Sequence, residues 1–250
     1  MSIIVRDRSG WVTRWNSGTS RPANVERHIH TALSEASSNG GGQVVLWVER
    51  VDTSLDACAM AAGFTSWRKL LQMRCSLPTR ASKMITRSFN ESDAAAVLHV
   101  NNRAFSWHPE QGGWTLDDFA QRVAEPWFDA DGLRIYEASG QVCVPALAQS
   151  FHASQTTSQI AAFCWTKIHP ANAASGDPEL GEIYVAAVDP EFQRQGLGVE
   201  TVLAGLQWLN RRGVATGMLY VEHDNVAALR TYERVGFEVH HVDQAYRRCV

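Results

Sequence analysis

The sequence predicts an α/β fold in which helices pack on a mixed α+β sheet, and three observations support this. Hydrophobic residues make up 45% of the 250 residues and charged residues 20%, which is the composition of a globular chain. A chain of this length buries a core without help from metals or disulfides. Apolar, β-branched runs typical of strands alternate along the chain with segments that repeat apolar residues at helical spacing.

A first block, residues 1–80, is predicted to hold four elements in the order helix, strand, helix, strand. The first helix spans residues 25–36, with Ile29 and Leu33 on one face and Asn24 as its N-cap. The other elements are a strand over residues 43–49, a helix that begins at Thr53 or Ser54 and ends at Ala62, and a strand near residues 67–73. A boundary is expected at residues 78–83.

A second block, residues 83–250, carries a longer series of strands and helices. We predict strands over residues 83–87, 133–137, 159–168, 182–188, 218–221 and 238–246. Helices are predicted after Asn90 and over residues 116–125, 198–212 and 225–235. The polar stretch 138–158 is expected to be a long surface loop that contributes neither binding nor chemistry.

Charge and cysteine content exclude several classes of protein. Lys plus Arg total 23 against 26 for Asp plus Glu, so the net charge of −3 argues against nucleic-acid binding and against an anionic membrane anchor. No apolar stretch is long enough to cross a membrane or to form an export signal. The five cysteines form no C-x-x-C pair, which argues against a disulfide framework and a zinc site. A cytoplasmic protein is therefore expected.

One motif carries most of the functional information. In the segment DPEFQRQGLG, Gln193, Gly196 and Gly198 fit the spacing Q/R-x-x-G-x-G/A between a strand and a helix. Two glycines allow a ligand to approach the backbone, and the free N–H groups of a helix N-terminus attract an anion such as a pyrophosphate. The alternative is a tight strand-to-helix turn without a ligand. A dinucleotide fingerprint and a Walker loop are excluded, because Thr201 stands where the third glycine is required and no Gly-Lys-Ser/Thr follows.

The order of elements around this motif resembles the GCN5-related N-acetyltransferase (GNAT) fold over residues 83–250. The segments NNRAFSWHPEQGGWT, EPWFDADGLRIYE, FCWTKIHP, LGEIYVAAVDPEFQRQGLG and LYVEHDNVAALRTYERVGF together resemble the catalytic domain of the mycothiol synthase family. The resemblance implies acetyl transfer from acetyl-CoA to the cysteinyl amine of 1-O-[2-(L-cysteinylamino)-2-deoxy-glucopyranosyl]-myo-inositol. An acetyltransferase with another amine acceptor and a non-catalytic acyl-CoA-binding module remain as alternatives.

The same resemblance implies which residues bind the two substrates. The residues implied for acetyl-CoA are Ala186, Ala187, Val188, Gln193, Arg194, Gln195, Gly196, Leu197, Gly198, Val199, Asn225, Val226, Ala227, Ala228, Leu229 and Arg230. Those implied for the acceptor are Glu110, Lys167, Glu182 and Tyr220. Each acceptor residue has a simpler interpretation, because a lone Glu or Lys is usually solvated surface and a Tyr on an apolar strand is often core.

Acetyl transfer to an ammonium acceptor needs a base, a donor to the thioester oxygen and an acid for the departing thiolate. We predict Glu182 as the base, a backbone N–H near Ala187 or Val188 as the donor, and Tyr232 as the acid. The spacing alone is equally consistent with Tyr232 as helix core, because it shares a face with Ala228, Leu229 and Val235. The histidines show no metal-ligand spacing, so no metal is expected.

Members of the mycothiol synthase family resemble two tandem acetyltransferase domains, of which the first does not catalyse. The first block here resembles the closing half of such a domain, and the segment NSGTSRPANVERH stands where a cofactor loop would be but lacks Q/R-x-x-G-x-G. We therefore expect a truncated, degenerate and non-catalytic first domain, one acetyl-CoA per chain and a monomer. The first block is expected to cover an edge or a face of the catalytic domain.

Overall fold

The computed structural model describes residues 3–7, 10–16, 22–108, 110–139, 158–173 and 176–250. Most of the predicted loop over residues 138–158 therefore lies outside the described residues. Within the described residues, no helix is both long enough and apolar enough to cross a membrane. The four cysteines among them, Cys58, Cys75, Cys164 and Cys249, carry free thiols.

The described strands form one sheet of ten strands in the order β1-β2-β3-β10-β4-β9-β8-β7-β6-β5. The strands are β1 (Val5–Asp7), β2 (Gly10–Asn16), β3 (Gln43–Glu49), β4 (Thr65–Ser76), β5 (Arg87–Ser88), β6 (Leu133–Ser139), β7 (Ser158–His169), β8 (Leu180–Val188), β9 (Thr216–Glu222) and β10 (Glu238–Cys249). The helices are α1 (Pro22–Ser38), α2 (Thr53–Ala61), α3 (Ala94–Ala104), α4 (Leu116–Val123), α5 (Leu197–Arg211) and α6 (Val226–Val235).

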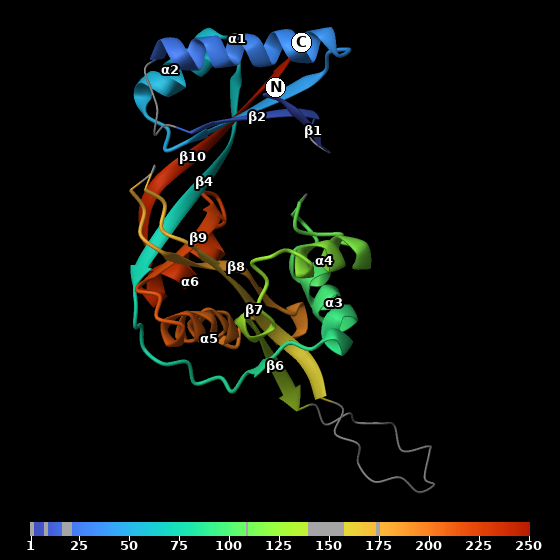
Figure 1. Ribbon diagram of the computed structural model, residues 1–250. Coiled ribbons are helices and arrows are strands. Elements are labelled where there is room, and N and C mark those ends of the chain that lie inside the picture. The colour runs from blue at the N-terminus through green and yellow to red at the C-terminus, as the bar shows by residue number, and fades with distance from the viewer. Residues whose placement is uncertain (1–2, 8–9, 17–21, 109, 140–157, 174–175) are drawn as a thin grey trace, which may run out of the picture.

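Two long strands join the halves of the molecule. Strand β4 belongs to the first block by sequence, yet it pairs with β9 and β10 of the second block. Strand β10 ends the second block and pairs with β3 of the first block. Figure 1 shows β4 and β10 running between the part that carries α1 and α2 and the part that carries α3 to α6. The two blocks therefore share one continuous ladder of backbone hydrogen bonds.

Three apolar clusters place the helices on the sheet. One cluster packs α1 and α2 against β3 and Tyr246. A second packs α5 and α6 against the sheet around Ile183, and a third packs α3 and α4 around Val185 and Ala187. At β8, α5 and α6 cover one face of the sheet and α3 and α4 cover the other (Figure 1). Ile183 and Val185 face opposite sides although they are two residues apart, because the register of β7 and β8 shifts between them.

The start of the first block differs from the prediction. Two strands precede the first helix, and β2 pairs in parallel with β3. Its signal was the aromatic and β-branched run Trp11–Thr13 with Trp15, which is shorter than the neighbouring helical pattern. Helix α1 begins at Pro22 and not after Asn24, because proline suits the first turn of a helix.

Other boundaries shift by a few residues. Helix α2 begins at Thr53, as predicted, and Asp52 caps it, since its side chain accepts hydrogen bonds from the backbone N–H groups of Ser54 and Leu55. The strand predicted over residues 83–87 is reduced to Arg87–Ser88. The remaining predicted strands and helices are confirmed, and β3 has the predicted bounds.

Candidate active site

Strands β8 and β9 separate soon after they meet. They pair in parallel only at Gly181 with Gly217 and at Glu182 with Met218, whereas β8 stays paired with β7 as far as Val188. From Ile183 onward, the edge of β8 that faces β9 has no strand partner. This edge can therefore accept hydrogen bonds from, and donate them to, a ligand that enters between the two strands. Glu182 lies at the last paired position, at the apex of the gap.

A cavity of about 500 Å³ occupies this gap. Most of the residues predicted for acetyl-CoA line it, namely Ala186, Ala187, Val188, Gln193, Arg194, Gly196, Gly198, Val199, Asn225, Ala227 and Ala228. Tyr232 lines it as well. Three elements that are separate in sequence, β8, the N-terminus of α5 and the N-terminus of α6, thus meet around one cavity.

The loop before α5 has the geometry of an anion site. Gly196 is the N-cap of α5 with a φ of 81°, and no side chain caps the helix there. Arg194 also has a left-handed φ, of 61°. A Cβ built on Gly196 would meet no atom within 4 Å, so the space in front of the first helical N–H groups is open. The helix dipole and these N–H groups favour a phosphate at this position.

Helix α6 closes the other side of the cavity. The side chain of Asn225 accepts a hydrogen bond of 3.1 Å from the Ala228 backbone N–H and so fixes the start of the helix. Two turns later, the Tyr232 ring packs edge-to-face on Phe237 with centroids 5.9 Å apart. Burial raises the pKa of Tyr232 to about 12. The phenol therefore keeps its proton throughout the neutral range.

Five predicted residues lie outside the wall of this cavity: Gln195, Leu197, Val226, Leu229 and Arg230. Leu229 instead packs against the core cluster under α5 and α6. For the four helical residues the reason is helical periodicity, because only one side of each helix faces the cavity, whereas Gln195 lies in the loop before α5. The prediction carried over whole segments and could not separate the two sides.

Sequence reasoning missed one wall of the cavity. Phe105 and Trp107, which follow α3, line it together with Ala104. Trp107 is 59% exposed, which is unusual for so large an apolar side chain. A signal was present, because AFSW places two aromatic residues in a loop directly after a helix. Thr201, Val202, Thr231 and Arg234 complete the set of lining residues that were not predicted.

Beyond the apex of the gap, Glu182 contacts a histidine. The Glu182 Oε2 lies 2.6 Å from Nε2 of His169, the last residue of β7. The Glu182 side chain is 12% exposed and that of His169 is 34% exposed. Lys167 lies directly opposite Glu182 in the β7–β8 ladder, and its Nζ lies 4.7 Å from the centre of the Trp127 ring. A carboxylate and an ammonium group therefore lie on one face of the sheet.

A second cavity, of about 530 Å³, opens on this side. Tyr220 and His169 line it with Gln72, Asn172, Asp177, Leu180, Met218 and four residues of the loop before β8. Burial raises the pKa of Tyr220 to about 12, and the Tyr220 hydroxyl accepts a hydrogen bond of 2.8 Å from Gln72 Nε2. The cavity thus combines hydroxyl and amide groups suited to a polar ligand.

Glu110, on the loop after α3, lines neither of these two cavities. Its carboxylate pairs with Arg68 on β4, with 2.5 Å between Nη1 and Oε1. The Nε of Arg68 also donates to Glu222 at the end of β9, at 2.8 Å. The first block therefore supplies a half-buried arginine that pairs with Glu110 and Glu222. Sequence could not reveal this, because the contact depends on β4 lying beside β9.

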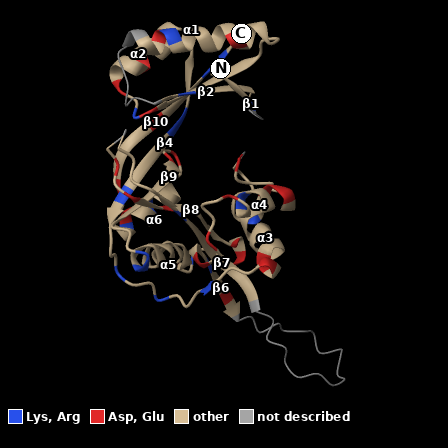
Figure 2. Ribbon diagram, viewed as in Figure 1, with Lys and Arg blue, Asp and Glu red and all other residues tan. Residues whose placement is uncertain are grey.

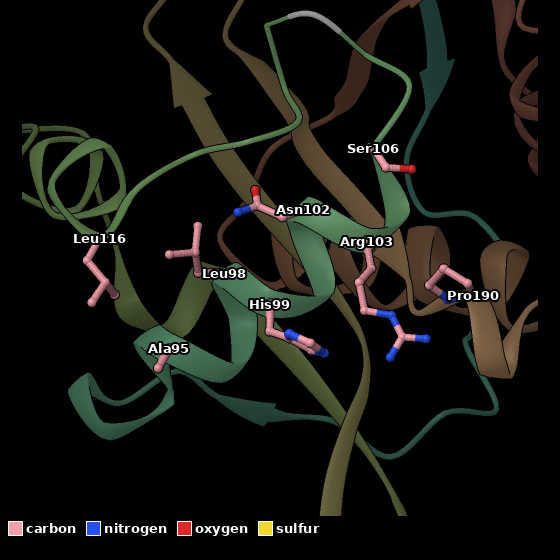
Figure 3. Close-up of a pocket in the computed structure, with 8 residues that line it drawn as sticks. All are labelled: Ala95, Leu98, His99, Asn102, Arg103, Ser106, Leu116 and Pro190. Carbon is pink, nitrogen blue, oxygen red and sulfur yellow. The ribbon is translucent and has the colours of Figure 1, made fainter.

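A further cavity, of about 580 Å³, lies on the outer side of α3 and contains none of the predicted residues (Figure 3). In Figure 3, Arg103 and His99 project from α3, and Arg103 lies near Pro190. Arg103 pairs with Glu191 at 3.0 Å and with the fully buried Asp189 at 3.4 Å. These contacts tie α3 to the start of the loop that carries Gly196.

The described residues include no group of three or more His, Cys, Asp or Glu side chains arranged to hold a metal ion. Basic and acidic residues are interspersed over both halves of the ribbon (Figure 2). The local positive charge at the cofactor cavity comes from Arg194, Arg234 and the N-terminus of α5.

Comparison with known proteins agrees with this geometry. The chain matches the acetyltransferase (GNAT) family over residues 105–237. It is 40% identical over 239 residues to a mycothiol acetyltransferase of Rhodococcus erythropolis, covering 92% of this chain and 74% of that protein. It is also 40% identical to a mycothiol acetyltransferase of Nocardia farcinica, over 90% of this chain and 71% of that protein.

Two solved structures share the fold. A GCN5-related N-acetyltransferase from Sphaerobacter thermophilus aligns with a TM-score of 0.72 at 15% identity, over 98% of this chain and 75% of that one. A tandem GNAT protein from the clavulanic acid biosynthesis pathway aligns with a TM-score of 0.62 at 16% identity, over 93% of this chain and 72% of that one. Both alignments extend through the first block.

Proposed function

Since the chain belongs to the GNAT acetyltransferases and, within them, to the mycothiol acetyltransferase family, we propose that it makes mycothiol. In the proposed reaction, an acetyl group moves from acetyl-CoA to the cysteinyl amine of 1-O-[2-(L-cysteinylamino)-2-deoxy-glucopyranosyl]-myo-inositol. The products are mycothiol and CoA. The enzyme is an N-acyltransferase. The observation that carries the proposal is the carboxylate of Glu182 at the apex of the gap between β8 and β9.

The residues around the gap fit acetyl-CoA. The open N-terminus of α5 at Gly196, with Arg194 beside it, would hold the pyrophosphate. The unpaired edge of β8 at Ala186–Val188 would hydrogen-bond the amides of the pantetheine arm and donate an N–H to the thioester oxygen. Asn225 and the first turn of α6 would line the opposite side. Acetyl-CoA bound here supplies the activated acetyl group.

Glu182 and Tyr232 have the proton roles in this proposal. Glu182 takes a proton from the acceptor ammonium, directly or through a water, so that the amine becomes nucleophilic. Tyr232 donates its phenolic proton to the departing thiolate. Because burial raises the pKa of Tyr232 to about 12, the phenol carries its proton in the neutral range, as a proton donor must. General acid or base catalysis of this kind is worth ~10²–10⁴-fold in rate.

The acceptor would occupy the cavity on the far side of Glu182. Tyr220 lines this cavity and offers a hydroxyl. Lys167, opposite Glu182 in the β7–β8 ladder, and Glu110, on the loop after α3, lie outside its lining and would add a cation and a carboxylate, which suit a polyhydroxylated ligand with an ammonium group. Arg68 would set the position of Glu110. This arrangement supports an acceptor that is long and polar and not a compact hydrophobic amine.

The first block, residues 1–80, is proposed to be a truncated and non-catalytic acetyltransferase-like domain beside the catalytic domain, residues 83–250. It supplies β4, and with it Arg68 and Gln72, to the acceptor side. One acetyl-CoA per chain follows from a single Q/R-x-x-G-x-G loop. We further propose a monomer that works in the cytoplasm, without a nucleic-acid or membrane partner.

Acceptor selectivity tests the proposal. The purified chain is assayed by mass spectrometry with acetyl-CoA and the cysteinyl pseudodisaccharide, with the des-cysteinyl glucosaminyl compound as control. Only the cysteinyl compound should be N-acetylated. Acetylation of unrelated amines alone would favour an acetyltransferase with another acceptor. Binding of acetyl-CoA without turnover of any amine would indicate a non-catalytic acyl-CoA-binding module.

A further inference from the structure

The proton roles proposed for Glu182 and Tyr232 do not account for the contact between His169 and Glu182. A base that has taken a proton from the acceptor must lose it before the next turnover. The Glu182 side chain is only 12% exposed and does not line the second cavity, whereas His169 is 34% exposed and does. The distance of 2.6 Å between Oε2 and Nε2 is short enough for direct proton transfer.

His169 is the proton acceptor that the second cavity offers. Asp177 is held by two guanidinium groups, at 2.8 Å from Arg50 and 2.7 Å from Arg74. Tyr220 keeps its proton, because burial raises its pKa to about 12. The other described lining side chains are amides, apolar groups and prolines. An imidazole is also the side chain best suited to take and release a proton near neutral pH.

The charged groups around His169 agree with this role. Glu182 on β8 is its direct partner, and Asp177, with its two arginines, lies across the cavity. Lys167 lies two residues earlier on the same face of β7, with its ammonium over the Trp127 ring. The nearest carboxylate that is available to the imidazole is therefore the proposed base itself.

We propose that His169 is a positioning and proton-relay residue, which orients Glu182 and carries the acceptor's proton from it to water at the exposed part of the imidazole ring. This rests on the proposed function, in which Glu182 is the base. The proton leaves the acceptor ammonium for Glu182, moves from Oε2 to Nε2 of His169, and a proton leaves the imidazolium for water. The amine is left neutral, and exchange with water restores the imidazole with a free Nε2.

The test replaces His169 and supplies its chemistry from outside. His169→Ala opens space beside a cavity large enough for imidazole, and His169→Asn keeps a polar side chain of similar reach without a relay. Both variants should lose at least 10-fold in kcat, with acetyl-CoA affinity unchanged. Added imidazole should restore kcat of His169→Ala, and a series of substituted imidazoles should restore it in an order set by their pKa. His99→Ala, an exposed histidine of α3, is the control and should be neither impaired nor rescued.

A second comparison separates failure of this inference from failure of the proposed function. His169→Ala should add little to the loss already caused by Glu182→Gln, because the two residues act in series. If Glu182→Gln is impaired while His169→Ala and His169→Asn keep full kcat, the relay is refuted and the proposed function stands. A loss in His169→Ala that no imidazole restores also refutes the relay. If Glu182→Gln itself is fully active, the assignment of the base is wrong.

Discussion

Replacing Tyr232 by phenylalanine separates a role in chemistry from a role in the core. The hydroxyl makes no hydrogen bond to any residue that the structure describes, while the ring packs on Phe237 and against the cluster under α5 and α6. Tyr232→Phe therefore keeps the packing and removes only the hydroxyl of a residue that lines the cavity between β8 and α6. Its effect on stability should stay below ~1 kcal/mol, because no buried partner is left unpaired.

The effect on turnover should be far larger. Loss of a general acid lowers kcat by ~10²–10⁴-fold. At ~1.36 kcal/mol per factor of ten, this is ~2.7–5.5 kcal/mol of transition-state stabilisation. Because burial raises the pKa of Tyr232 to about 12, its protonation does not change in the neutral range. The variant should therefore be slow across that range, and its profile should keep the shape of the wild-type profile.

The assay combines steady-state kinetics, calorimetric binding of acetyl-CoA and thermal unfolding. For Tyr232→Phe we expect a large fall in kcat, an unchanged Kd and a Tm within a few degrees of wild type. Tyr232→Ala is the contrast, because deleting a buried ring costs ~3–5 kcal/mol and should lower Tm clearly. Full turnover in Tyr232→Phe would refute the reasoning. Tyr232 would then be a residue of the hydrophobic core, and solvent would be the acid.

Three further predictions concern the cofactor site and the core. Gly196 and Gly213 lie at the two ends of α5, and an alanine at either position places a Cβ in open space at positive φ. Gly196→Ala and Gly213→Ala should therefore each lower the free energy of unfolding by ~1 kcal/mol. Only Gly196→Ala should also weaken acetyl-CoA binding, as measured by calorimetry. Calorimetric titration of the wild type should give one acetyl-CoA per chain, and a stoichiometry near two would contradict a degenerate first domain. The hydrogen bond from Arg87 lowers the pKa of Asp93, so this pair stabilises the fold above the unfolded pKa and is lost as pH falls through the folded one. Asp93→Asn should accordingly destabilise by ~2 kcal/mol at pH 7, and urea unfolding should show the difference shrink below about pH 4.

Local patterns predicted most of the secondary structure. The run from Gln43 to Glu49 is apolar and β-branched, and β3 has those bounds. Helix α5 was predicted from apolar residues at helical spacing, and it begins within one residue of the predicted start. In both cases the information lies within a short window of sequence, because strand and helix periodicity are local properties.

The pairing of β4 and β10 with strands of the other block could not be predicted in this way. Leu71 pairs with Val221 on one side and with Val242 on the other, and neither partner is close to it in sequence. An alternating pattern predicts which side chains of a strand share a face, but it does not predict which other strand pairs with that strand. The contacts of Arg68 with Glu110 and Glu222 could not be predicted for the same reason.

His169 shows a different limit. The segment WTKIH places His169 two residues after Lys167, and strand periodicity puts both on one face. The pattern therefore indicates that His169 and Lys167 share a face, but the contact of His169 with Glu182 depends on the register of β7 and β8. The residues predicted for the acceptor and for catalysis stay predictions until variants are measured.

The central claim is that the carboxylate at the apex of the gap between β8 and β9 deprotonates the acceptor. The pH dependence of kcat/KM for wild type and Glu182→Gln tests it most directly, since glutamine keeps the shape of the side chain but cannot take up a proton. We predict that the variant loses ~10²–10⁴-fold in kcat/KM and that the fall in rate at acidic pH, which we expect of the wild type, disappears. A variant that keeps the acidic fall and changes only the acceptor KM would show that Glu182 positions the acceptor and that the base lies elsewhere.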